Sequence, residues 1–91
     1  MGQIERRIIE AAARLLADGN KVVTEDQLLE AILPPNEPEA RFRHSYAYAV
    51  DRLVRRGLLA SQWEGTKRIG YIITQKARDE LARQDSRSTR S

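Results

Sequence analysis

Residues 41–81, RFRHSYAYAVDRLVRRGLLASQWEGTKRIGYIITQKARDEL, contain the signals that decide the fold. The pattern predicts an amphipathic helix that ends at Gly57, two strands joined by a turn at residues 64–67, and a helix that begins at Thr74. Side chains spaced three and four apart share one side of a helix. The side that we expect to face the core carries Phe42, Tyr46, Ala49, Val50, Leu53 and Val54.

The other side of the same predicted helix is polar and basic. It carries Arg41, His44, Ser45, Tyr48, Arg52 and Arg55, with Arg43 at the boundary. Residues 41–68 hold seven Lys/Arg against two Asp/Glu, a net charge of +5, whereas residues 1–40 hold four against eight, a net charge of −4. Such an uneven distribution attracts polyanions. An ordinary solvated face explains any single Arg, but it is a poor explanation for seven cations in so short a segment.

The first forty residues predict two more helices. Apolar residues from Ile4 to Leu16 recur at helical spacing over residues 3–17, and Asp18-Gly19-Asn20 ends that helix. Val22-Val23 can form a very short strand. Thr24 is the expected cap of a second helix, with Gln27 as its capping-box partner, and Pro34-Pro35 ends it. The third helix is capped either by Asn36 with Glu39 or by Glu37 with Pro38 in the first turn.

The strands and the last helix complete one domain, which we place at residues 1–83. Alternation puts Leu59, Ser61 and Trp63 on one face of the outgoing strand, and Ile69, Tyr71 and Ile73 on one face of the return strand. Trp63 is expected to pack under the hairpin, with a place in an interface as the alternative. The last helix is expected over residues 75–84, and the polar tail at residues 84–91 is expected to be disordered.

Several classes of function are disfavoured by composition. The chain has no Cys and one His, His44, so metal and nucleophilic sites lack their usual ligands and bases. We expect four carboxylates to lie on helix surfaces: Glu5, Glu10, Asp26 and Glu30. The glycines are scattered and form no phosphate-binding loop. We therefore expect no enzyme activity, no metal and no cofactor. No apolar stretch approaches 18 residues, so we expect no membrane span and a cytoplasmic location.

Two segments resemble the winged helix-turn-helix transcriptional regulators of the PadR and MarR kind. The segment YAVDRLVRRGLL at residues 48–59 is similar to the end of their recognition helix. The segment RIGYIITQKARDEL at residues 68–81 is similar to their Tyr-x-x-Thr-x-x-small-x-x-x-Leu pattern, with Ala77 where Gly is usual. The resemblance covers residues 3–83. It implies an α+β, mostly helical fold with a three-helix core, a two-stranded wing and a C-terminal helix.

Both the charge pattern and the resemblance favour a sequence-specific regulator that binds double-stranded DNA, with the third helix in the major groove and the wing on the flanking backbone or minor groove. The alternatives are a protein that coats DNA with little specificity and a protein-interaction module. The expected DNA-binding residues are Arg41, Arg43, His44, Ser45, Tyr48, Arg52, Arg55, Lys67 and Arg68. A homodimer is expected, with an interface built from Ile4, Ile8, Ile9 and Leu81.

Overall fold

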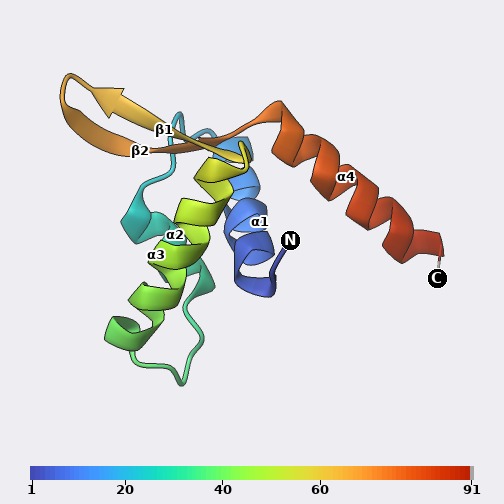
Figure 1. The fold of residues 1–91 in the computed structure, drawn as a ribbon, viewed down its shortest axis with the longest axis horizontal. Helices are drawn as coiled ribbons and strands as arrows, with labels where there is room; N and C mark the ends of the chain where they lie inside the picture. The colour runs from blue at the N-terminus through green and yellow to red at the C-terminus, as the bar shows by residue number, and fades with distance from the viewer. Residues whose placement is uncertain (91) are drawn as a thin grey trace.

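The computed structural model describes the backbone of residues 1–90 and the side chains of residues 1–84. The protein is α+β and mostly helical, with four helices and a two-stranded antiparallel sheet. Figure 1 shows the hairpin projecting from one side of the helical body and the last helix from the other. In chain order the elements are α1 (Gln3–Ala17), α2 (Glu25–Ile32), α3 (Glu39–Arg55), β1 (Leu59–Glu64), β2 (Lys67–Ile73) and α4 (Gln75–Arg90).

Local signals set most helix ends. The predicted cap of α2 is confirmed, because the Gln27 backbone N–H donates to Thr24 Oγ1 at 3.2 Å and the Thr24 N–H donates to Gln27 Oε1 at 2.9 Å. Gly57 follows α3 with φ of +76°, a left-handed conformation that favours glycine. Both predicted caps of α3 are wrong. The cap position is Pro38, whose side chain has no acceptor for the first N–H groups.

The core lies between α1, α2, α3 and the base of the hairpin. Its fully buried large side chains are Ile8, Ile9, Val23, Leu28, Leu53, Leu58 and Leu59. The apolar side predicted for α3 is confirmed at Phe42, Tyr46, Ala49, Val50 and Leu53. Val54 instead remains partly exposed. The leucines that follow Gly57 therefore anchor the hairpin to the three helices.

A short backbone pairing fixes the hairpin against the loop before α2. The Val23 N–H donates to the Tyr71 carbonyl at 2.9 Å, and the Tyr71 N–H donates to the Val23 carbonyl at 2.8 Å. The short strand expected at Val22-Val23 is thus reduced to one bridge. Gly70 allows this approach, since a Cβ there would lie 2.6 Å from the Val23 carbonyl oxygen. The hairpin is consequently held at β2, the strand that carries Lys67 and Arg68.

The last helix is attached at its first two turns. Thr74 Oγ1 accepts from the Ala77 N–H at 3.2 Å, which confirms the predicted cap, and donates to the Gly57 carbonyl at 2.7 Å. Ala77 is fully buried. The helix runs to Arg90, further than expected. The tail expected at residues 84–91 falls largely outside the residues whose side chains are described. No described helix has the length and apolar character needed to cross a membrane.

Candidate nucleic-acid interface

The hairpin carries a cluster of one cation and two aromatic rings. Strand pairing runs regularly from Leu59 opposite Ile73 to Gln62 opposite Gly70, and then shifts so that Trp63 lies opposite Arg68. Ile69 has no partner in this register, as at a β-bulge. Of the residues predicted to share a face of β2, Tyr71 and Ile73 are buried and Ile69 is exposed. Arg68 lies on the face that carries Tyr71 and Trp63.

This geometry places the Arg68 guanidinium beside both rings. Its central carbon is 5.2 Å from the centre of the Tyr71 ring and 6.0 Å from that of the Trp63 indole. Both distances are within the range of cation–π attraction. We call Trp63, Arg68 and Tyr71 the hairpin cluster. Trp63 does not pack under the hairpin as expected, because 59% of its surface is exposed.

One side of α3 faces this cluster across a hollow of about 200 Å³. Arg68 and Tyr71 line it from β2, Ser61 from β1 and Glu25 from the start of α2. The walls that α3 contributes are Tyr46, Ala47, Val50, Asp51 and Val54. Arg43 lies one helical turn before Ala47 and hence on this side of α3. The hairpin side of α3 thus combines a basic residue with an open concave surface.

The other side of α3 faces the start of α1. A wider hollow of about 640 Å³ is lined there by Gly2, Gln3, Ile4, Glu5, His44, Ser45, Tyr48 and Ala49. Arg41 lies one turn before Ser45 and so belongs to the same side. The expected DNA-binding residues are therefore divided. Arg43, Lys67 and Arg68 lie on the hairpin side, whereas Arg41, His44, Ser45 and Tyr48 lie on the α1 side.

Arginines near the end of α3 have carboxylate partners. Glu5, only 5% exposed, is bound by Arg52 Nε at 3.3 Å and by Arg56 Nη1 at 3.3 Å. The expectation that Glu5 is a surface carboxylate is wrong, because the end of α3 covers it. Arg55 Nε pairs with Asp51 Oδ2 at 3.1 Å, and this ion pair is exposed to solvent. Arg52 is thereby tied to the fold, although about half of its side chain is exposed.

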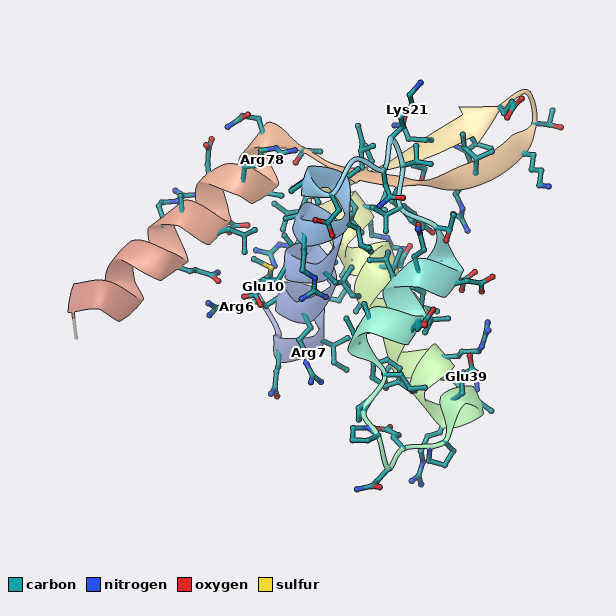
Figure 2. All side chains as sticks on the ribbon, turned by 180° about the vertical axis from the view of Figure 1, so that it is seen from behind. Arg6, Arg7, Glu10, Lys21, Glu39 and Arg78 are labelled. Carbon is teal, nitrogen blue, oxygen red and sulfur yellow. The ribbon has the colours of Figure 1, made fainter. Side chains whose placement is uncertain are left out.

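The cations at the start of α3 and on β2 have fewer carboxylate partners than the arginines near the end of α3. Among the described side chains, Arg41, Lys67 and Arg68 have no carboxylate within ion-pair distance. Arg43 pairs with Glu39 at 3.4 Å, a contact exposed to solvent and hence weak. Glu39 lies at the start of α3 (Figure 2). The ion pair between Arg6 Nε and Glu10 Oε1, 2.6 Å apart, lies on α1 in the same view. Among the expected DNA-binding residues, the arginine and lysine side chains without a described carboxylate partner are thus Arg41 at the start of α3 and Lys67 and Arg68 on β2.

Two buried tyrosines lie near Arg68: Tyr46 on α3 and Tyr71 of the hairpin cluster. Burial raises the pKa of Tyr46, and the nearby Tyr71 and Glu25 raise it further, while Arg68 and Arg43 oppose the rise. Burial also raises the pKa of Tyr71, against the opposing effect of Arg68. The Tyr46 ring is in the core as predicted, and its buried hydroxyl has no hydrogen-bond partner among the described residues.

The residues expected at a dimer interface differ in accessibility. Ile8 and Ile9 are 0% exposed within the single chain, so the expectation that they leave apolar surface uncovered is wrong. Both lie in the core, where α1 packs against α2 and α3. Ile4 and Leu81 are half-buried. Only these two of the four expected residues can contribute surface to a partner.

No group of three or more His, Asp or Glu side chains that could hold a metal occurs in the described part of the chain. Comparison with models of known protein families gave no match, and a search of curated proteins found no similar sequence.

Proposed function

We propose that the protein is a small cytoplasmic regulator that binds double-stranded DNA, as a homodimer, through a winged helix-turn-helix. In this proposal α2 and α3 form the helix-turn-helix, α3 enters the major groove, and the β1–β2 hairpin is the wing. The order of the elements is compatible with that layout. The resemblance of residues 48–59 and 68–81 to PadR-like and MarR-like regulators also supports it.

The position of Lys67 and Arg68 carries the proposal. Both cations lie at the start of β2, next to the hairpin turn, and neither has a carboxylate partner among the described side chains. Arg68 lines the hollow whose opposite wall is α3. With α3 in the major groove, the phosphate backbone at the edge of the groove would pass the hairpin. Lys67 and Arg68 would there neutralise its phosphates.

The two sides of α3 have different roles in this proposal. A helix in the major groove presents its sides to the two walls of the groove. Arg43, on the hairpin side, is the candidate for a base-edge contact, because Arg binds guanine O6 and N7 through two hydrogen bonds. Arg41, His44, Ser45 and Tyr48 would meet the opposite wall. Arg52 would act mainly by holding α3 against α1 through Glu5.

Binding with little sequence preference is the second candidate. It is favoured by the pairing of Arg43 with Glu39 and of Arg55 with Asp51, which occupies arginines of α3 that could otherwise read bases. In that case the contacts of Arg41, Lys67 and Arg68 with phosphates would dominate.

Selection of duplexes from a random library, followed by affinity measurements, tests the proposal. Arg43→Ala should reduce the preference for the selected duplex over a scrambled one by roughly 1–3 kcal/mol. Lys67→Ala should weaken both duplexes equally. Arg7→Ala, which removes an exposed cation from α1 (Figure 2), is the matched control and should change neither affinity. If the library yields no enriched sequence, binding with little specificity is the better account.

A further inference from the structure

Trp63 is the only tryptophan, and it stands with 59% of its surface exposed on a projecting hairpin. An aromatic ring of that size is normally placed where its apolar surface is covered. Alternation along β1 puts Trp63 on the same face as Leu59, which is buried in the core, and Ser61, which is half-buried. The hairpin projects from the helical body (Figure 1), and more than half of the Trp63 surface is open to solvent.

The shift in strand register determines what lies next to the indole. Without it, Trp63 would lie opposite Ile69, and the exposed end of the hairpin would be apolar. With it, Arg68 lies opposite Trp63, 6.0 Å from the indole centre. Lys67 is the next residue, and it lies opposite Glu64. The indole and the Arg68 guanidinium therefore lie on one small surface, and Lys67 adds a second positive charge at the adjacent hairpin turn.

That combination matches the chemistry of a nucleotide. A nucleobase has flat π-faces that stack on an indole, and its phosphate is bound by Lys or Arg. Within an intact duplex both faces of a base are covered by its neighbours, and exposing one costs a few kcal/mol. An unpaired base presents a face at much lower cost. The fitting ligand is therefore DNA that contains an unpaired base.

We propose that Trp63 is a stacking site for an unpaired nucleobase, with Arg68 and Lys67 binding the adjacent phosphates. This inference rests on the proposed DNA binding and adds a substrate class to it. The hairpin would then hold a bulged, mismatched or single-stranded position beside the duplex that α3 occupies. Tyr71 would support the site from behind, since its ring lies 5.2 Å from the Arg68 guanidinium.

The emission of Trp63 provides a direct test on the full chain, because no other tryptophan contributes. Three oligonucleotides are compared: a fully paired duplex, the same duplex with one unpaired base, and the single strand. Stacking should quench the emission with the last two, whereas saturation with the paired duplex should leave it nearly unchanged. Trp63→Ala should weaken binding to the bulged duplex roughly 5- to 100-fold, as expected for the loss of one base–aromatic stack. The same variant should change binding to the paired duplex less than about twofold.

Two further variants make the result specific. Trp63→Phe should retain most of the preference for the bulged duplex, because a smaller ring still stacks. Ile69→Ala, at the unpaired position of β2, removes an exposed apolar side chain outside the cluster and should have no effect. Circular dichroism should show all three variants folded.

Equal binding and equal emission on paired and bulged duplexes would overturn the inference and leave the proposed function intact. A loss that is equal on all DNAs in Trp63→Ala would also overturn it, since it would make Trp63 an ordinary duplex contact. Absence of binding to all three oligonucleotides would overturn both proposals.

Discussion

The carboxylate of Glu5 at the start of α1 binds the guanidinium of Arg56 at the end of α3, with 3.3 Å between Oε2 and Nη1. Arg52 binds the other oxygen of the same carboxylate. Arg56 also approaches Glu80 of α4 at 3.8 Å, and its carbonyl accepts a hydrogen bond from Lys76 Nζ at 2.8 Å. One buried carboxylate therefore connects the first helix with the end of the candidate recognition helix and, through Arg56, with the last.

Glu5→Gln should destabilise the protein, because it removes the charge that both arginines bind. A fully buried pair that loses one partner costs about 3–5 kcal/mol. Arg52 and Arg56 are about half exposed, so water compensates part of the loss, and we expect about 1–3 kcal/mol. Urea unfolding measures the change. Glu10→Gln, which breaks only the exposed pair with Arg6, should cost less than about 1 kcal/mol. Equal effects of the two substitutions would contradict this account of Glu5.

Tyr46→Phe should leave stability at pH 7 unchanged or raise it by up to about 2 kcal/mol, because it keeps the ring and removes a buried hydroxyl that has no hydrogen-bond partner in the described part of the chain. Thermal unfolding measures this. Tyr48→Phe, at an exposed tyrosine, is the control and should have no effect. A loss of more than about 1 kcal/mol in Tyr46→Phe would show that the hydroxyl has a partner.

The same residue predicts how stability depends on pH. Burial raises the pKa of Tyr46 in the folded state above its ordinary value of 10.0. Above about pH 10 the unfolded chain loses this proton while the folded chain keeps it, so the free energy of unfolding should fall as pH rises. The stability is fully present below that pH. Unfolding measured between pH 8 and pH 11 should show a smaller fall in Tyr46→Phe, and an identical fall would contradict the assignment.

The sequence predicts those elements whose signals are local. Thr24 with Gln27 defines the start of α2, and Gly57 defines the end of α3, because each acts through the neighbouring backbone. The apolar side of α3 also follows from helical spacing alone. The shift at Trp63 could not be predicted, since strand register depends on the approach of Val23 to β2 in three dimensions.

The candidate site is predicted less completely than the fold. Spacing identifies the exposed residues of α3 and places Arg43 at the boundary of the basic side. It does not predict that Arg43 lies toward the hairpin while Ser45 and Tyr48 lie toward α1, because spacing says nothing of the neighbour along each flank. Burial of Glu5 depends on Arg52 and Arg56, which are about fifty residues away in the chain. The net charge of residues 41–68 was a useful signal, but it did not distinguish paired from unpaired cations.

Assembly can be tested at Ile4. This residue is half-buried at the exposed end of α1, whereas Ile8 has no exposed surface. Ile4→Glu should give a folded chain that sediments as a monomer at micromolar concentration, while the unmodified protein sediments as a dimer. Ile8→Glu should instead unfold the chain, because it buries a charge in the core. A monomeric unmodified protein, both free and on DNA, would remove the homodimer from the account.

Duplex binding as a function of salt concentration tests the central claim most directly. Among the described side chains, Arg41, Lys67 and Arg68 have no carboxylate partner and Arg43 has only an exposed one, so about four phosphates can be neutralised by each protomer. The logarithm of the association constant, plotted against the logarithm of salt concentration, should have a slope of about −3 to −4 per protomer. The slope should be about one unit shallower in Lys67→Ala. A slope near zero, or no measurable binding at low salt, would contradict the proposal that this protein binds DNA.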